Sequence, residues 1–275
     1  MRIQHNIAAL NSYRNLTNNN SAVSKNLEKL SSGYRINRAG DDAAGLAISE
    51  KMRAQITGLE TAQKNANDGI SLVQTAEGAL TEVHSMLNRM VELADQSANG
   101  TYDDPTDRAN LQKEVTSLTA EINRISDGTN FNGINLLNGS LATSGLTLQI
   151  GDTADPFNKL TVTIGNMSAA SLGIADINIG TQFNAASAIS HIKDAINLVS
   201  TTRGNLGATQ NRLEHTINNL SVTSENMTAA ESRIRDVDMA KEMMAYTKNN
   251  ILVQASQAML AQANQIPQGV LQLLQ

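Results

Sequence analysis

Apolar residues recur every seven positions over two long stretches of the chain, and this spacing restricts the fold more than any other feature. A period of seven places one apolar seam along a helix and favours pairing between long helices. The first seam runs through Leu59, Ala66, Val73, Leu80, Leu87 and Ala94, and the second through Ile192, Val199, Leu206, Leu213, Leu220 and Met227. Arg203 and Gln210 interrupt the column beside the second seam, and we expect them to fix its register.

The length of the first helix and the shortage of aromatic residues favour an elongated molecule. A continuous helix over residues 44–99 would be about 80 Å long at about 1.5 Å per residue, whereas a compact globule of this chain length has a radius of gyration of about 19 Å. Only three Phe, four Tyr and no Trp are present, so a thick aromatic core is not expected. The sequence therefore predicts a mainly α fold, a long coiled-coil-like helical rod.

Two smaller elements are expected between the long helices. Asp104 and Pro105 start a shorter helix that Gly128 ends, and Leu111, Val115, Leu118, Ile122 and Ile125 recur in it at intervals of three and four. Two alternating runs follow, within residues 146–150 and 160–164, and they predict a small β-hairpin near 140–165. The flanking segments contain many glycines and are expected to be turn-rich connections.

The two chain ends carry apolar stripes that have no partner nearby in the sequence. An Asn-rich stretch over residues 15–20 is a poor helix former, and no charged side chain follows Lys248. Since a solvated helix normally carries charge on its outer face, we expect both faces of the last helix to become covered. The ends are predicted to pair into an inner coiled coil and with copies of the chain, through Ile3, Ile7, Leu10, Val23, Leu27, Leu30, Leu252, Met259, Ile266, Val270 and Leu273.

This pattern predicts two regions with different roles. Residues 1–43 together with 232–275 would form a terminal assembly domain, and residues 44–231 an outer helical rod that carries the hairpin. Because the unpaired end stripes bury too little surface to offset the backbone ordering cost of about 1–2 kcal/mol per residue, we expect both ends to be largely disordered in the monomer and to become helical during assembly. Gly33, Gly40 and Gly45, in the linking segment, are expected in turns.

Composition argues against several functional classes. The net charge of −5 and the scattered Lys and Arg give no basic face for nucleic acid, and the apolar runs are too short to span a membrane. The amino-terminal residues have no apolar signal core, which favours a cytosolic protein or one exported without cleavage. The four His are far apart, and Asp41 and Asp42 are expected to cap a helix or form a salt bridge. We expect no enzyme activity, no metal and no cofactor.

Several segments, in the right order, resemble bacterial flagellins. They are MRIQHNIAALNSYRNL at the start, SSGYRINRAGDDAAGLAISEKMR from residue 31, ELADQSANGTY from residue 92, FNGINLLNG from residue 131, SRIRDVDMAKEM from residue 232, and the final ILVQASQAMLAQANQIPQGVLQLLQ. The resemblance implies a secreted structural subunit of the flagellar filament, in which both termini form the innermost tube. The short stretch after Gly128 implies a near-minimal form with inner and outer core domains only.

The resemblance also implies partners. They are further copies in a homopolymer, the flagellar export apparatus, a secretion chaperone, the filament cap, the hook-junction proteins and the Toll-like flagellin receptor of vertebrate hosts. The matching receptor-contact positions are Leu87, Asn88, Arg89, Glu92, Leu93 and Glu114. Spacing alone would instead place Leu87 in the seam and leave Arg89 and Glu92 as solvated charges.

Two alternatives stay open at this stage. A hook-filament junction protein would share the terminal helices but form a single ring. A secreted coiled-coil adhesin or receptor ligand would act as a monomer or a small bundle. Long helical filaments seen by electron microscopy after salt precipitation would separate the flagellin interpretation from both.

Overall fold

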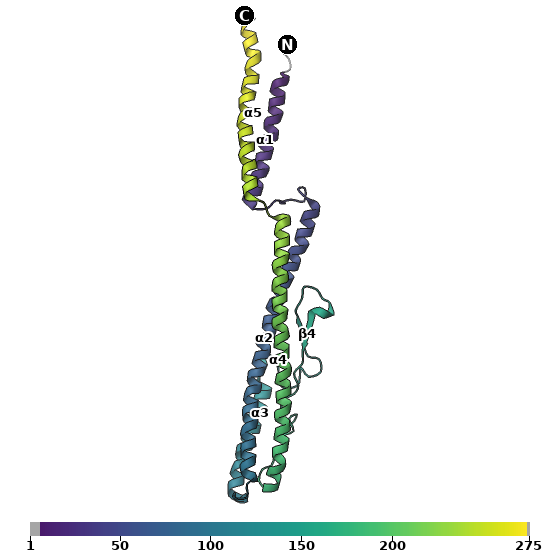
Figure 1. Cartoon of the computed structure of the whole chain (residues 1–275), viewed down its shortest axis with the longest axis vertical. Helices are drawn as coiled ribbons and strands as arrows, with labels where there is room; N and C mark the ends of the chain where they lie inside the picture. The colour runs from purple at the N-terminus through teal and green to yellow at the C-terminus, as the bar shows by residue number, and fades with distance from the viewer. Residues whose placement is uncertain (1–5, 274–275) are drawn as a thin grey trace. The chain divides into compact units, whose positions relative to one another are not determined.

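The protein is described by a computed structural model that covers the backbone of residues 6–273 and, within that range, the side chains of all but residues 104, 105 and 267–273. Five α-helices account for most of the described chain: α1 (Ile7–Ser32), α2 (Ala43–Ala98), α3 (Ala109–Gly128), α4 (Gln182–Arg235) and α5 (Met239–Leu273). They are drawn in Figure 1. The remaining elements are a π-helix η1 (Asp104–Arg108), a 3-10 helix η2 (Pro156–Asn158), and strands β1 (Asn130–Phe131), β2 (Ile134–Asn135), β3 (Leu146–Gln149) and β4 (Lys159–Val162).

The chain divides into two compact units. The terminal unit comprises Met1–Ile56 and Glu225–Gln275, and the central unit comprises Thr57–Ser224. Helices α2 and α4 each contribute residues to both units. The predicted fold class is confirmed: the chain is mainly α, with long helices and small two-stranded sheets.

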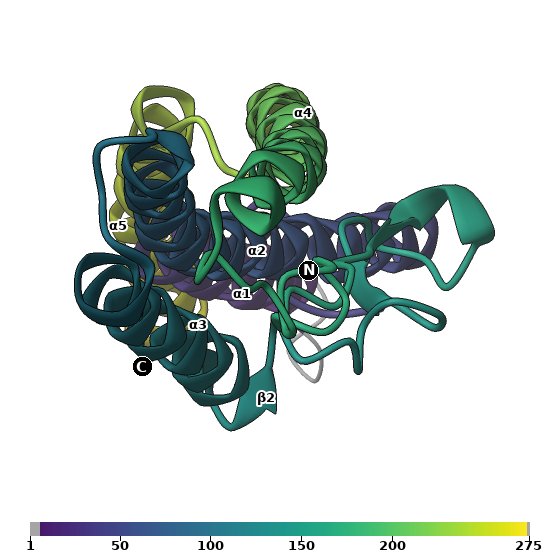
Figure 2. The ribbon, with the colours of Figure 1, turned by 90° about the horizontal axis from the view of Figure 1, so that it is seen from below.

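The core of the central unit lies between α2, α3 and α4, which run next to one another in both views (Figures 1 and 2). The first predicted seam is buried throughout, from Leu59 at 6% exposed to Ala94 at 0%. The second seam is buried as far as Leu220. Both heptad predictions therefore identified the residues that hold these helices together.

A column of small residues on α2 lies beside the first seam and was not predicted. Ala62 and Ala76 are almost fully buried, and a Cβ added at Gly69 would lie 2.4 Å from Leu148 Cδ1 and 3.4 Å from Leu213 Cδ1. Small side chains carry little hydropathy signal, yet here they let β3 and α4 approach the backbone of α2 closely. The column positions the hairpin.

The predicted hairpin is present as the antiparallel pair β3–β4, in a register that places Leu146 opposite Val162 and Leu148 opposite Leu160. A second hairpin, β1–β2, lies in a segment that was expected to be a turn-rich connection. Asn132 and Gly133 connect its strands with φ of 51° and 80°, the left-handed pair that a two-residue Asn-Gly turn adopts.

The connections around these strands are packed into the core rather than lying loosely on the surface. The segment between α3 and α4 contributes fully or almost fully buried apolar side chains: Leu136, Leu137, Leu141, Leu160, Val162, Ile164, Met167, Ala169, Leu172, Ile174 and Ile179. A polar side chain of α3 forms hydrogen bonds with the backbone of this segment: Gln112 donates to Ile177 O at 3.0 Å and accepts from Ile179 N at 2.6 Å. Such bonds satisfy backbone groups that have no ladder partner.

Arg203, which interrupts the column beside the second seam, has a partner on α2. Arg203 Nη2 lies 3.5 Å from Glu77 Oε1 of α2, and both side chains are partly exposed. An apolar column at this point would tolerate a shift of one heptad, whereas the charged pair is satisfied in a single alignment. This contact is consistent with the predicted role of Arg203 in setting register.

Candidate assembly interface

Helices α1 and α5 pack along each other in antiparallel directions within the terminal unit (Figure 1). The half-buried positions of α1 recur at intervals of three and four, and those of α5 do the same. They form a seam of small, polar and medium-sized apolar side chains: Ala9, Ser12, Leu16, Asn19, Val23, Asn26 and Leu30 on α1, and Glu242, Tyr246, Asn249, Val253, Ser256, Leu260 and Ala263 on α5. The predicted pairing of the two ends is therefore present within one chain.

Asparagines inside this seam explain how α1 stays helical through its Asn-rich stretch. Asn19 Nδ2 donates to Ser256 Oγ at 3.0 Å and to Leu252 O at 3.4 Å. At the start of the helix, Asn6 accepts from Ala9 N at 3.1 Å as an N-cap and donates to Ala263 O at 2.8 Å. Tertiary hydrogen bonds thus override the low helix propensity of these residues.

The α1–α5 pair has almost no core of its own. No described residue of α1 is fully buried, and Ala263 is the one residue of α5 in the described buried apolar set. By contrast, eight residues of α4 are buried. Since hydrophobic burial is the main favourable term in folding, this pair is held much more weakly than the central unit.

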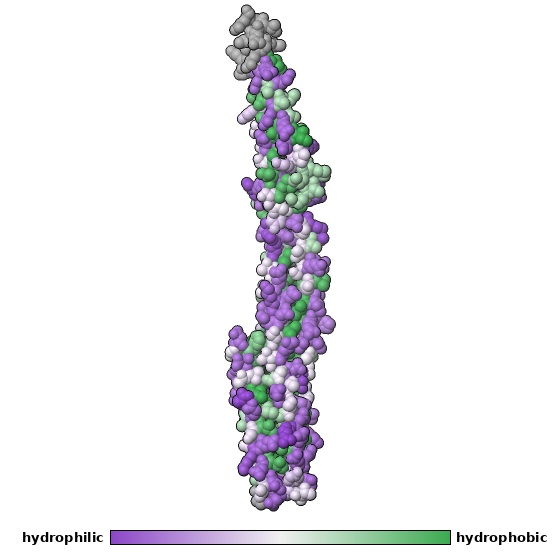
Figure 3. Space-filling model, turned by 90° about the vertical axis from the view of Figure 1, so that its left-hand side faces the viewer, coloured by the Kyte–Doolittle hydropathy of each residue, from purple (hydrophilic) through white to green (hydrophobic). Residues whose placement is uncertain are grey.

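A set of exposed apolar residues on α5 lies outside the seam, on a surface that also contains polar residues and the exposed Lys248. We call this set the outer face; it consists of Met244, Ile251, Leu252, Met259 and Ile266, which are 68%, 60%, 39%, 64% and 54% exposed. Figure 3 shows hydrophobic residues recurring between polar ones along the surface. Exposed apolar residues on a helix that is already packed along one side normally indicate a second neighbour.

The structure separates the predicted assembly residues into two groups. Val23 and Leu30 lie in the seam with α5 and are half-buried. The other described residues of the set are exposed: Ile7, Leu10, Leu27, Leu252, Met259 and Ile266. Ile3 lies outside the described residues, and the side chains of Val270 and Leu273 lie outside them as well. The assembly role of the whole set stays a prediction.

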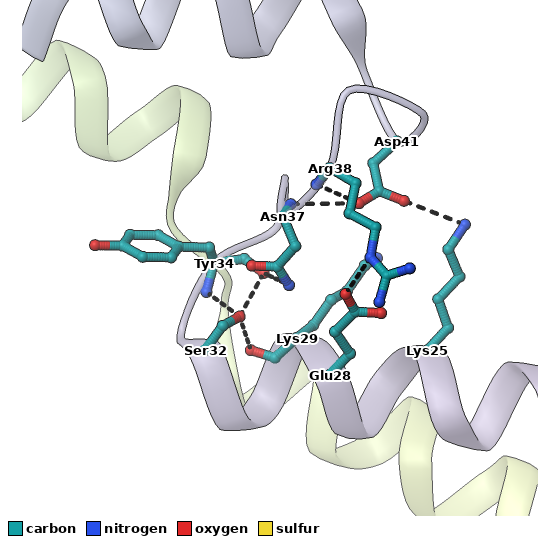
Figure 4. A network of polar contacts seen from close by, with 8 residues as sticks. All are labelled: Lys25, Glu28, Lys29, Ser32, Tyr34, Asn37, Arg38 and Asp41. Carbon is teal, nitrogen blue, oxygen red and sulfur yellow. Dashed lines mark hydrogen bonds and ion pairs between the residues drawn. The ribbon is translucent and has the colours of Figure 1, made fainter.

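The loop between α1 and α2 is ordered by short-range polar contacts (Figure 4). Asp41 Oδ2 accepts from the backbone N–H of Arg38 at 3.2 Å and of Asn37 at 3.3 Å, and Asp41 Oδ1 lies 3.4 Å from Lys25 Nζ. The hydrogen bonds from Arg38 and then Asn37, with a smaller contribution from Lys25, lower the pKa of the Asp41 carboxyl. Arg38 also bonds Glu28 at 2.8 Å.

Asp42 and Gly45 have structural roles beside this loop. Asp42 Oδ1 accepts from Gly45 N at 2.9 Å and caps the start of α2, so the two adjacent aspartates serve as the expected cap and salt bridge. Gly45 was expected in a turn where the chain changes direction, and this is wrong, because Gly45 is helical and lies near the start of α2. Its small size is needed there, since an added Cβ would lie 2.8 Å from Ile36 Cδ1 and 2.5 Å from Asp42 Oδ2.

The same loop is also paired with the α4–α5 turn. Tyr34 and Asp236 form an isolated antiparallel bridge; Arg35 N donates to Arg235 O at 2.7 Å, and Val237 N donates to Gly33 O at 3.0 Å. The Arg235 guanidinium lies 4.9 Å from the centroid of the Tyr34 ring, within cation–π range. The points where the chain enters α2 and leaves α4 are therefore held together.

Two family models and full-length relatives all match this chain to one protein family. The model of the bacterial flagellin N-terminal helical region matches residues 3–142, and that of the C-terminal helical region matches residues 189–274. A flagellin of Bacillus subtilis is 57% identical, with 100% of both chains covered. The chain belongs to the bacterial flagellin family. A flagellin of Halalkalibacterium halodurans is also 57% identical over the full length of both chains.

A solved structure supports the fold alone. It is assigned to a flagellar hook-associated protein of Vibrio parahaemolyticus, with 14% identity, a TM-score of 0.59, and coverage of 71% of this chain and 100% of that one. The much closer full-length relatives carry the name flagellin. Members of the flagellin family are structural proteins, and the family supports a homopolymeric flagellar filament.

The predicted receptor positions lie on α2 and α3 in the central unit. Arg89 Nε lies 2.8 Å from Glu114 Oε1 and its Nη1 lies 2.9 Å from Glu92 Oε2; the hydrogen bond to Glu114, followed by that to Glu92, raises the pKa of Arg89. Asn88 is exposed beside them. Leu87 and Leu93 are 0% exposed and belong to the core, so in this conformation they support the surface from beneath.

Among the side chains that the structure describes, no three or more His, Asp or Glu are placed to hold a metal ion. Over the described residues, none of the helices has both the length and the apolar character that crossing a membrane would need.

Proposed function

We propose that the chain is a non-catalytic structural subunit that is exported from the bacterium and polymerises outside the cell into a flagellar filament through α1 and α5. The observation that carries this proposal is the outer face of α5, whose apolar residues are exposed although the seam of the same helix is already occupied by α1. A helical filament needs two different complementary surfaces on each subunit. The outer face of α5 and the exposed residues of α1 supply them.

The weak packing of the α1–α5 pair supports coupling of folding to assembly. Without buried side chains on α1, the pair gains little to offset a backbone cost of about 1–2 kcal/mol per residue. We therefore infer that residues 1–43 and 232–275 order fully in the polymer. Hydrogen exchange on monomer and filament tests this, and strong protection of both ends in the monomer would contradict it.

A charge placed on the outer face tests the polymerisation surface. Met259→Glu adds a carboxylate where an apolar contact is expected, and burying an unpaired charge is strongly unfavourable. We expect this variant to remain unpolymerised after salt precipitation, whereas the wild type gives long filaments by electron microscopy. Gln254→Glu is the matched control, since Gln254 is an exposed polar residue of the same helix. Filaments of normal length from Met259→Glu, or from a chain without residues 251–275, would refute the surface.

Membership of the family supports several further partners. The exposed outer face of α5 would need to be covered before export, which suits a secretion chaperone that binds this helix. The export apparatus, the filament cap and the hook-junction proteins are expected to handle the same terminal residues. Retention of a purified chaperone by the full chain, and its loss in the Met259→Glu variant, would support the first of these interactions.

We also infer recognition by the Toll-like flagellin receptor of vertebrate hosts, through Asn88, Arg89, Glu92 and Glu114. The exposed Arg89 is held by two carboxylates, and such a preorganised guanidinium is well suited to the centre of an interface. Arg89→Ala should reduce receptor signalling in a cell assay. Arg124→Ala is the control, since Arg124 is exposed and bonds Glu121 in the same i, i+3 arrangement. Equal signalling by the two variants would count against the assignment.

A further inference from the structure

Methionine is concentrated on the helix that is expected to assemble. Four of the ten methionines of the chain lie on α5, and all four are exposed: Met239 at 49%, Met243 at 49%, Met244 at 68% and Met259 at 64%. In the central unit, by contrast, Met90 and Met167 are 0% and 2% exposed. The thioether sulfur is soft and easily oxidised, and access decides which methionines react.

The four methionines of α5 are not equivalent. Met244 and Met259 belong to the outer face together with Ile251, Leu252 and Ile266. Met239 and Met243 are spaced four apart near the start of α5 and lie outside that face. The chain therefore offers an exposed pair on the face and an exposed pair beside it.

We propose that Met244 and Met259 are an oxidation site that controls polymerisation, an inference that rests on the proposed assembly role of the outer face. A peroxide oxidises the thioether: its O–O bond breaks, one oxygen forms the S–O bond of the sulfoxide, and the other leaves as water with both hydrogens. The sulfur loses two electrons and the peroxide gains them. A methionine sulfoxide reductase with a thiol reductant reverses the change.

The physical effect is to convert an apolar contact into a polar one. The sulfoxide oxygen is a strong hydrogen-bond acceptor, and burying it against an apolar neighbour removes its water without supplying a donor. Because both residues are exposed in the single chain, oxidation itself requires no unfolding.

The experiment compares polymerisation of the full chain before and after limited treatment with hydrogen peroxide, with peptide mapping by mass spectrometry. We expect sulfoxides to form first at the four α5 positions and last at Met90 and Met167. The critical concentration for polymerisation should rise by about tenfold, equivalent to about 1.4 kcal/mol per added subunit, and return after reductase treatment. In preformed filaments, Met244 and Met259 should be oxidised at least about tenfold more slowly than in the monomer.

Two conservative double variants isolate the outer face. Met244→Leu with Met259→Leu keeps apolar volume; the critical concentration of this untreated variant is its own reference, and it should not rise after peroxide treatment. Met239→Leu with Met243→Leu should remain as sensitive as the wild type. Sensitivity that follows the second pair instead, or an oxidised wild type with an unchanged critical concentration, would overturn the oxidation site while leaving the assembly role intact. Failure of the untreated chain to polymerise would overturn both.

Discussion

Gly69 and Gly78, two glycines on α2, should respond in opposite directions to the same substitution. At Gly78 an added Cβ meets nothing within 4 Å, so Gly78→Ala should stabilise the chain by about 0.5–1 kcal/mol through helix propensity and the lower entropy of the unfolded chain. At Gly69 the Cβ would lie 2.4 Å from Leu148 Cδ1. Leu148 would have to move, and overpacking of this kind costs about 1–3 kcal/mol.

The difference between the two variants isolates the packing effect because the propensity gain is common to both. Gly69→Ala should therefore unfold with a free energy about 1–3 kcal/mol lower than Gly78→Ala, and up to about 2 kcal/mol below the wild type once the propensity gain is subtracted. Urea unfolding of the full chain, followed by circular dichroism, measures these differences from the midpoints and slopes.

Removing Leu148 provides the internal control. In a Leu148→Ala background the obstructing methyl is absent, so Gly69→Ala should become neutral or stabilising, with a coupling energy of about 1–3 kcal/mol in the double-mutant cycle. If Gly69→Ala and Gly78→Ala stabilise the chain equally in the wild-type background, then close approach of β3 to α2 does not explain the glycine, and the reasoning fails.

Three further perturbations test other parts of the fold. Leu206→Ala removes a side chain that is 1% exposed and should cost about 2–5 kcal/mol of unfolding free energy; a loss below about 1 kcal/mol in urea would contradict a tightly packed seam. Gly33→Ala places a Cβ on a residue with φ of +75° at the end of α1 and should lower the unfolding free energy by about 1 kcal/mol. Helix should then be lost at a lower temperature in a thermal melt, and an unchanged melting temperature would contradict this. The pKa of Asp41 is lowered from its ordinary value of 3.8. The carboxylate therefore stabilises the folded loop above about pH 4, and this stabilisation is lost as the pH falls further through the folded-state pKa. Over that acidic range, amide exchange of Asn37 and Arg38 should accelerate in the wild type. In Asp41→Asn that acceleration should be absent, and identical pH profiles would exclude the carboxylate as its cause.

Much of the helical framework could be predicted because heptad spacing is a strong, local signal. The helix expected over 44–99 is α2, Ala43–Ala98, and its predicted seam is buried from Leu59 to Ala94. The strands of the main hairpin lie where alternation placed them. Family membership was also readable from the sequence, because the matching segments are long and occur in order.

The less predictable features depend on residues far apart in the chain. Within residues 15–20 of α1, Asn19 bonds Ser256 of α5, a long-range contact that local helix propensity does not predict. A small residue is required at position 69 because Leu148, some eighty positions away in sequence, packs against it. The receptor positions show the same limit, since Leu87 and Leu93 face the core while Arg89 and Glu92 face solvent.

The sequence by itself determined which residues form long helices, which faces of those helices are apolar, and the family to which the chain belongs. Only the tertiary structure decided which apolar face is already occupied: the seam of α5 lies against α1, and the outer face remains exposed. The physical reason is that hydropathy is a property of each residue alone, whereas the burial of a residue depends on which other segments of the chain pack against it. Which residues of α5 are covered and which remain exposed is therefore decided only once the chain has folded.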